Sequence, residues 1–251
     1  MGGGKDYRIA ILYICIGEYR VFWEEFFDSS ERYFLPLHKK EYFVFADSPP
    51  LYQGQNAQIH FYPQENLGWP LNTLKRFEMF LRAKDALQDF DFIFFFNANS
   101  VFIRPIGEEF LPLQEGLLVV EHPGFYNAKP DAFTYDRNPK SLAYIPYGEG
   151  EVYVMGAVNG GKTKAYLAMI EELARRIEVD LANGVIALWH DESHLNVYIH
   201  QNRDYKLLDA GYCYPHWEIP FEKKIYLKNK EEYFDVWAFK CPPPQRGFLK
   251  S

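Results

Sequence analysis

Three short segments of the chain carry residue types and spacings that could do chemistry. The segment from Gly156 to Thr163 has the glycine and lysine pattern of a phosphate-binding loop. His190 and His194 have the i, i+4 spacing of zinc ligands on one helix. The third segment, Asn97-Ala98-Asn99, places two amide side chains directly after a strongly apolar stretch. These patterns point to phosphate binding, zinc chemistry, or ligand binding at the end of a strand.

The phosphate-loop pattern GxxxxGK[ST] predicts a nucleotide triphosphatase, and the apolar run of residues 185–192 resembles the second motif of such enzymes. However, the apolar stretch before Gly156 is short. Trp189 and His190 also stand where an acid for magnesium is expected. A glycine turn that caps a helix beginning at Thr163 explains Gly160 and Gly161 more simply. A triphosphatase stays as an alternative function.

The spacing of His190 and His194 suggests a zinc hydrolase, but the residues between them do not fit that motif. In metalloproteases a glutamate directly follows the first histidine, whereas Asp191 follows His190 here and Glu192 comes next. No third ligand is evident from the sequence. The sequence therefore disfavours zinc, and we expect the chain to have no resident metal.

Apolar stretches of strand length alternate with stretches of helical periodicity. Strands are predicted at residues 7–16, 41–47, 59–63, 90–96, 117–122 and 152–155. Helices are predicted at residues 22–34, 71–87 and 163–177. This alternation indicates an α/β fold with a mostly parallel sheet, whose ligands bind beyond the carboxyl ends of the strands. We expect Asn97, the loop from Met155 to Lys162, and the segment from Trp189 to Glu192 to lie there.

Length and composition exclude several classes of protein. The chain has 251 residues, a formal net charge of -7 and 18% aromatic residues, which fits one globular domain with an aromatic-rich core. The acidic balance argues against a nucleic-acid binder, and no apolar run reaches the ~18 residues of a membrane-spanning helix. Three scattered cysteines suggest no disulfide framework, which favours a reducing cytoplasm. Nothing in the sequence indicates an oligomeric state.

Three regions are expected along the chain. Residues 1–6 form a disordered leader or a cloning remnant, residues 7–230 form the domain, and residues 231–251 form a loose tail with three consecutive prolines.

Five longer segments, in this order, carry a resemblance to a known family. They are HPGFY (122–126), AFTYDR (132–137), AYIP (143–146), YVMGAVNGG (153–161) and WHDESHLN (189–196). With Asn97-Ala98-Asn99 in place of an Asp-x-Asp motif, the chain resembles glycosyltransferase family 6 from about Tyr7 to Lys230. This family includes the histo-blood-group A and B transferases and the α-1,3-galactosyltransferases. The resemblance implies a GT-A fold, with a Rossmann-like, mostly parallel central sheet flanked by helices.

The resemblance also implies roles for individual residues. Those implied to bind the UDP-sugar donor are Ile14, Ile16, Tyr19, Asn72, Thr73, Arg76, Asn97, Ala98, Asn99, Met155, Gly156, Ala157, Asp191, Lys228 and Lys230. Those implied to bind the acceptor are His122, Thr134, Trp189 and Glu192. Within these sets, Tyr19 is expected near the uracil and Trp189 against a galactose ring. Glu192 is the implied catalytic residue.

The sequence departs from the family where metal-binding carboxylates are replaced by Asn97 and Asn99. Neutral amides hold a hard divalent cation far more weakly than carboxylates do. The departure predicts a metal-independent enzyme, as bacterial members with Asn-x-Asn are, with no cofactor. Arg76, Lys228 and Lys230 would then stabilise the charge that develops on the diphosphate.

The resemblance implies a retaining transfer of galactose or N-acetylgalactosamine in α-1,3 linkage to a β-galactoside, with a 2′-fucosylated acceptor expected. The triplet Met155-Gly156-Ala157 matches the galactose-using version of the family and favours UDP-galactose. The family's acceptor aspartate is missing near Pro215, and His216 or Glu218 are its possible replacements. A catalytically inactive UDP- or sugar-binding module stays as a further alternative. The expected location is the cytoplasm, either free or peripheral at the inner membrane.

Overall fold

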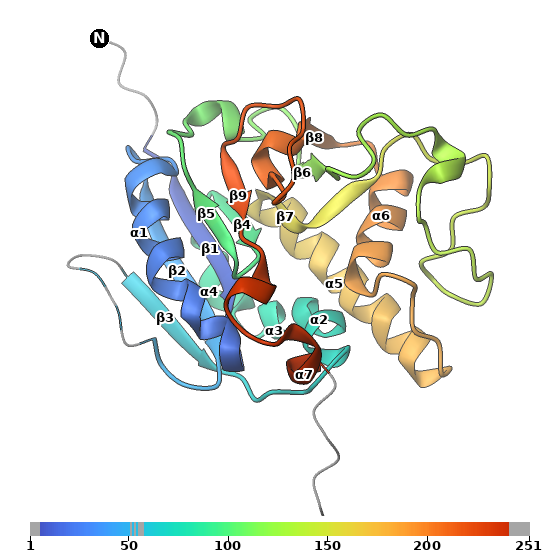
Figure 1. Ribbon diagram of the computed structural model, residues 1–251, viewed down its shortest axis with the longest axis horizontal. Helices are drawn as coiled ribbons and strands as arrows, with labels where there is room; N and C mark the ends of the chain where they lie inside the picture. The colour runs from blue at the N-terminus through green and yellow to red at the C-terminus, as the bar shows by residue number, and fades with distance from the viewer. Residues whose placement is uncertain (1–5, 51, 53, 55–57, 241–251) are drawn as a thin grey trace, which may run out of the picture.

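The computed structural model describes residues 6–50, 52, 54 and 58–240. A seven-stranded sheet with the strand order β3-β2-β1-β4-β7-β6-β8 forms its centre (Figure 1). Its strands are β1 (Arg8–Ile14), β2 (Lys39–Ala46), β3 (Gln58–Pro63), β4 (Phe92–Phe96), β6 (Leu117–Glu121), β7 (Val154–Lys162) and β8 (Tyr205–Leu208). β8 was not predicted from the sequence.

Four of the six strand pairings are parallel, which confirms the predicted mostly parallel sheet. The pairs β3–β2, β2–β1, β1–β4 and β6–β8 run parallel, whereas β7 runs antiparallel to both β4 and β6. β1 and β4 therefore end at the same edge of the sheet at which β7 begins.

The sheet is covered on both faces, because β4 is apolar at every position and β1 is apolar after Arg8. In β1, Ile9 and Ile11 face the side of helix α1 (Trp23–Tyr33), whereas Ala10 and Leu12 face the opposite side. That opposite side is covered by the short helix α3 (Arg76–Leu81) and the long helix α5 (Thr163–Ala182). α1 follows a 3₁₀ turn and matches the predicted helix, and α5 begins at Thr163 as predicted.

The single helix predicted at residues 71–87 is wrong. The chain forms three short helices, α2 (Leu71–Leu74), α3 and α4 (Lys84–Leu87), which are separated at Lys75 and Ala83. At both breaks ψ is close to zero, at 12° and 4°, so the chain bends while it keeps an apolar side on the sheet. The helical spacing of apolar residues survives these bends, and periodicity alone therefore could not reveal them.

The glycine-rich segment from Met155 to Lys162 is not a loop but most of strand β7. The turn predicted at Gly160 and Gly161 is wrong, because both residues pair with β4 and β6. A Cβ atom on Gly160 would lie 2.5 Å from the carbonyl oxygen of Ile93, and one on Gly161 would lie 2.5 Å from that of Gly116. These glycines permit close backbone approach in the sheet.

The C-terminal part of the described chain is folded against the domain. β9 (Ile225–Leu227) pairs antiparallel with β5 (Ser100–Phe102), and neither strand was predicted. A 3₁₀ turn (Lys230–Glu232) and helix α7 (Val236–Lys240) follow. The expectation of a loose tail is therefore wrong for residues 231–240, while residues 1–5 and 241–251, including Cys241, lie outside the described residues. Within the described part of the chain, no helix is long and apolar enough to span a membrane.

Candidate active site

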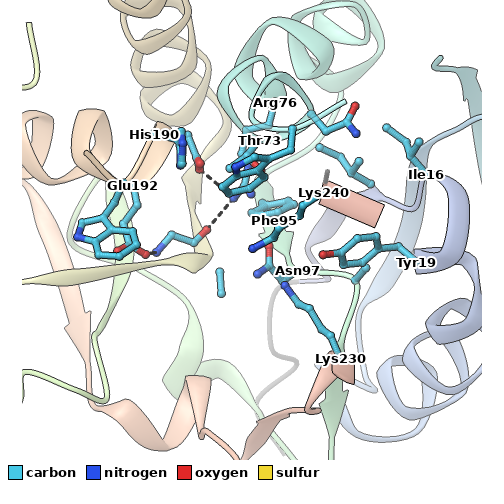
Figure 2. A pocket seen from close by; sticks show the side chains of 18 of the residues that line it. Ile16, Tyr19, Thr73, Arg76, Phe95, Asn97, His190, Glu192, Lys230 and Lys240 are labelled. Carbon is cyan, nitrogen blue, oxygen red and sulfur yellow. Dashed lines mark hydrogen bonds and ion pairs between the residues drawn. The ribbon is translucent and has the colours of Figure 1, made fainter. Parts of the chain in front are cut away.

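A cavity of about 470 Å³ opens at the sheet edge where β1 and β4 end and β7 begins. This volume lies within the range of small-molecule sites. The residues that line it are Ile14, Ile16, Tyr19, Trp69, Asn72, Thr73, Arg76, Phe95, Asn97, Ala98, Met155, Gly156, Ala157, Trp189, His190, Asp191, Glu192, Lys230, Phe239 and Lys240. The structure thus brings together fifteen of the residues that the sequence predicted for donor and acceptor binding (Figure 2).

The Asn97-Ala98-Asn99 turn follows β4 and is fixed from three directions. The Asn97 amide N–H donates to the Ala157 carbonyl at 2.8 Å, and the buried Tyr13 hydroxyl donates to the Ala98 carbonyl at 2.9 Å. The Asn99 side chain is turned away from the cavity, and its amide donates to the Lys228 carbonyl at 2.7 Å. Asn99 therefore does not line the cavity, and its contact with the donor stays a prediction.

Glu192 lies at the start of helix α6 (Asp191–Gln201), with both carboxylate oxygens held. The Gly156 N–H donates to Oε2 at 2.7 Å, and the Tyr153 hydroxyl donates to Oε1 at 3.0 Å. A Cβ atom on Gly156 would lie only 3.2 Å from Oε2, so the glycine permits this approach. Burial raises the pKa of Glu192 to about 7, although the Gly156 hydrogen bond opposes that rise.

Arg76 and Asp191 form a buried ion pair beside Glu192. Arg76 Nη1 lies 3.0 Å from Asp191 Oδ2 and donates to the Gly156 carbonyl at 3.0 Å, while the guanidinium stacks over Phe95. Burial raises the pKa of Asp191 to about 6, against the effect of the Arg76 charge. Asp191, Arg76, Gly156 and Glu192 thus form one connected polar network at the cavity wall (Figure 2).

Four consecutive residues, from Trp189 to Glu192, line the cavity because the backbone is distorted at His190. His190 has φ 56° and ψ -125°, a left-handed conformation that is strained for a residue with a side chain. Its ring contacts the edge of Trp69, at 4.6 Å between ring centroids. Trp189 is half-exposed, so its indole is available to a ligand. Strain of this kind is concentrated at functional sites.

Two lysines of the C-terminal segment contribute positive charge to the cavity. Lys230 Nζ lies 5.2 Å from the Tyr19 ring centroid, and Lys240 Nζ lies 4.3 Å from that of Trp69. Burial, together with Lys240 and Arg76, lowers the pKa of Lys230 to about 8. Lys228 points elsewhere, since it pairs with Glu25 and does not line the cavity. Lys228 therefore does not line this cavity and its donor role stays a prediction, whereas Lys240, which lines the cavity, was missed.

The side of the cavity opposite Glu192 is largely apolar. Ile14 and Ile16 continue from the end of β1, and Tyr19 follows in the 3₁₀ turn (Gly17–Phe22). Tyr19 makes edge contacts with Phe234 and Phe239, so the C-terminal segment packs against the ring predicted to lie near the uracil. An apolar wall that ends in an aromatic ring can hold a flat heterocyclic base.

His122 and Thr134, predicted to bind the acceptor, do not line this cavity. The His122 ring packs against Tyr153 at 5.4 Å, and its Nδ1 accepts a hydrogen bond from the Gly124 N–H at 3.0 Å. Thr134 interacts with the Tyr153 hydroxyl. Both residues therefore reach Glu192 only through Tyr153, and their contact with an acceptor stays a prediction.

The sequence reasoning missed Trp69, Phe95, Phe239 and Lys240. It placed His190 within the predicted segment from Trp189 to Glu192 but gave this residue no role toward a ligand. Phe95 lies in a predicted buried strand, and Phe239 and Lys240 were assigned to a loose tail. Trp69 stands three residues before Asn72, so sequence proximity was the only available signal for it. Residues 239 and 240 carried no signal, because only the tertiary fold returns them to the cavity.

The chemistry of the side chains does not suit a divalent metal at the Asn-x-Asn turn. Asn99 is turned to the Lys228 carbonyl, which leaves one neutral amide, Asn97, at the cavity. Among residues 6–50, 52, 54 and 58–240, no group of three or more His, Cys, Asp or Glu side chains is arranged to hold a metal ion. His194, the second supposed zinc ligand, is buried 3.6 Å from Asp180 and away from His190's cavity.

The geometry also excludes the phosphate-loop alternative. Lys162 donates to the Gln114 carbonyl, and the Thr163 hydroxyl donates to the Phe90 carbonyl, both at the far end of β7 from the cavity. A phosphate loop needs these side chains and consecutive N–H groups to converge on one anion. In β7 those N–H groups belong to an extended strand.

The fold and site together define a glycosyltransferase with the GT-A fold. A mostly parallel α/β sheet carries, at the ends of β1 and β4, a cavity with an apolar wall, three cationic side chains (Arg76, Lys230 and Lys240) and the carboxylates of Asp191 and Glu192.

The comparisons with known proteins then identify its family. Residues 4–229 match the model of glycosyltransferase family 6, and the chain belongs to this family. It is 36% identical to the O-antigen biosynthesis glycosyltransferase WbnI of Escherichia coli over 89% of this chain and 95% of that protein. It is 31% identical to the Histo-blood group ABO system transferase 2 of Rattus norvegicus, over 84% of this chain and 64% of that one. It is 30% identical to the human Globoside alpha-1,3-N-acetylgalactosaminyltransferase 1, over 82% and 60% respectively. The chain thus spans less than two thirds of these two mammalian relatives.

Proposed function

We propose that this protein transfers galactose, in preference to N-acetylgalactosamine, from the UDP-sugar to a β-galactoside in α-1,3 linkage. The anomeric configuration is retained and no divalent metal takes part. The observation that carries the proposal is that Glu192 and Lys230 lie on different sides of one cavity (Figure 2), which Met155, Gly156 and Ala157 also line. This arrangement provides a nucleotide-sugar with a carboxylate on one side and cations on the other.

Retention follows if Glu192 faces the anomeric carbon opposite the diphosphate. In the reaction the bond from C1 to the β-phosphate oxygen breaks, the acceptor O3 forms the new bond on the same face, and the O3 proton passes to the departing diphosphate of UDP. Glu192 either attacks C1 to form a glycosyl-enzyme or stabilises an oxocarbenium ion while the acceptor enters beside departing UDP. Both routes need an ionised carboxylate, which a pKa of about 7 allows near neutral pH.

Metal independence is supported by the neutral side chains at the Asn-x-Asn turn and by Lys230. The leaving diphosphate gains negative charge in the transition state, and fixed cations aimed at that charge lower the barrier. Among the residues that the structure describes, Lys230 forms no ion pair, and its ammonium group lies over the ring of Tyr19. Arg76 is already engaged by Asp191 and the Gly156 carbonyl, so its charge acts through that network.

The preference for galactose rests on Ala157, which lies at the cavity and leaves less room beside the sugar than a glycine. One methyl group in such a pocket changes discrimination by only ~1–3 kcal/mol. Among the relatives named above, only the human one has a name that specifies a donor sugar, and that sugar is N-acetylgalactosamine, the less favoured donor of this proposal. A 2′-fucosylated acceptor is proposed by analogy with the blood-group relative.

The reducing cytoplasm is proposed as the location, because Cys15 and Cys213 are free, buried thiols.

A donor and acceptor panel tests the proposal. UDP-galactose and UDP-N-acetylgalactosamine are each offered with lactose and with 2′-fucosyllactose, in EDTA and in manganese. We expect α-1,3 transfer in EDTA, highest with UDP-galactose and 2′-fucosyllactose. Activity that vanishes in EDTA and returns with manganese would contradict metal independence. UDP binding without transfer or donor hydrolysis would show a binding module instead.

A further inference from the structure

Tyr153 is a buried phenol that directly contacts the carboxylate of Glu192. It is 1% exposed and immediately precedes β7. Its hydroxyl donates to Glu192 Oε1 at 3.0 Å, while the other oxygen accepts from the Gly156 N–H at 2.7 Å. The two bonds come from opposite ends of the four-residue stretch from Tyr153 to Gly156. They leave the Glu192 side chain little freedom to rotate.

The Tyr153 ring is itself held in place by a cluster of aromatic side chains. It stacks on Tyr135 with 5.4 Å between centroids and an interplanar angle of 27°, and it contacts Phe125 at 4.7 Å. His122 packs on its edge, and Thr134 interacts with its hydroxyl. The phenol therefore connects the two predicted acceptor residues outside the cavity to the carboxylate inside it.

We propose that Tyr153 is a positioning residue for sugar transfer, which holds Glu192 toward the cavity in its ionised form. The proposal rests on the role proposed above for Glu192. A hydrogen bond that the Tyr153 phenol donates is stronger when Glu192 is an ionised carboxylate than when Glu192 is a neutral carboxyl group. The bond therefore favours the charged state of Glu192. Other groups that face Glu192 electrostatically are Asp191 and Arg76 at the cavity wall and the buried Cys213 thiol behind it.

The test is Tyr153→Phe, which removes one oxygen atom and keeps the ring that packs against Tyr135. Loss of a hydrogen bond to an ionised group raises the pKa of Glu192 by about one unit. The acidic limb of the pH profile of kcat should therefore move about one unit to higher pH. Turnover should fall about fivefold at pH 7 and recover toward pH 9, with the KM for the donor unchanged.

Tyr135→Phe is the matched control, because the Tyr135 hydroxyl in the same cluster donates only to the Val152 carbonyl, at 2.6 Å. It should leave the acidic limb in place. Thr134→Val, which removes the group beside the Tyr153 hydroxyl, should move the limb in the same direction by less. This second variant keeps the test decisive if Tyr153→Phe does not fold.

An unmoved limb in folded Tyr153→Phe or, failing that, in Thr134→Val overturns the positioning role. A lowered Tm with an unmoved limb shows that Tyr153 is merely structural and likewise overturns it. Glu192→Gln, measured in parallel, separates this inference from the proposed function. If Glu192→Gln keeps normal turnover, the role of Glu192 fails. If only Tyr153→Phe behaves like the wild type, the inference about Tyr153 fails alone.

Discussion

The two charged sides of the cavity are built in contrasting ways. The anionic side, Asp191 and Glu192, lies within the folded core of the domain, and each carboxylate is bonded to groups that are themselves buried. The cationic side, Lys230 and Lys240, belongs to the last described residues, and these side chains rest on the rings of Tyr19 and Trp69. One side is fixed by hydrogen bonds, and the other by contacts with aromatic faces.

The difference indicates a division of labour. A reacting carboxylate must be held in position to act on one carbon atom, so rigid hydrogen bonds around it favour the reaction. Cations that stabilise a diphosphate act over a longer range and tolerate a looser attachment. Burial makes the anionic side costly to the fold, since it raises the pKa values of Asp191 and Glu192.

The largest expected effect concerns the anionic side. Glu192→Gln should lower kcat about 10³-fold at pH 8, because the amide neither attacks C1 nor carries negative charge. UDP affinity, measured by calorimetry, should stay within about threefold of wild type. The matched control is Glu149→Gln, since Glu149 is exposed and bonds only His200. Near-normal turnover of Glu192→Gln would remove this residue from the mechanism.

The next effect concerns the cationic side. Lys230→Met keeps the apolar stem but removes the charge, and kcat should fall about 10²-fold, as when one preorganised donor to a developing oxyanion is lost. Addition of manganese should not restore it, because the Asn-x-Asn turn supplies no carboxylate. Full activity of Lys230→Met in EDTA would show that the cationic side does not assist the departure of UDP.

A stability measurement tests whether the buried carboxylate of Glu192 lowers the free energy of unfolding. The pKa of Glu192 is raised from 4.5 to about 7, so the native state binds more protons than the unfolded state between these pH values. The stability contribution of Glu192 therefore falls as the pH rises through this window. Glu192→Gln should raise the free energy of unfolding by about 3 kcal/mol at pH 8 and by less than about 0.5 kcal/mol at pH 4.5. Urea denaturation at both pH values measures this, and equal effects at both would contradict the buried-charge explanation.

The smallest expected effect on turnover concerns Lys228, which stands two residues before Lys230 in the chain. Lys228 pairs with Glu25 outside the cavity, so Lys228→Met should change kcat and the donor KM by less than about twofold. The same steady-state assay applied to Lys230→Met provides the contrast. A loss as large as that of Lys230→Met would mean that Lys228 moves into the cavity when the donor binds.

Much of the fold and of the anionic side could be predicted from the sequence. The apolar runs of β1 and β4 predict buried strands because both faces of the sheet are covered. The segment from Trp189 to Glu192 could be identified because its four residues are consecutive. A motif of consecutive residues can be recognised in the sequence without knowledge of the tertiary structure. Most of the aromatic residues, including Phe92 and Phe94, belong to the core as expected.

Only the tertiary structure decided the remaining features, because they depend on residues far apart in the chain. Gly160 looks the same in a turn and in a crowded strand, and the approach of Ile93 and Gly116 determines which it is. Lys228 and Lys230 are equivalent in sequence, but the bond from Asn99 to the Lys228 backbone and the Glu25 carboxylate direct one outward. Likewise, nothing in the sequence distinguishes Tyr153 from the other aromatic residues. Only folding brings its hydroxyl to Glu192, which lies 39 positions away in the chain. The sequence alone thus determined the sheet and the segment from Trp189 to Glu192, whereas long-range contacts determined which polar groups meet at the cavity.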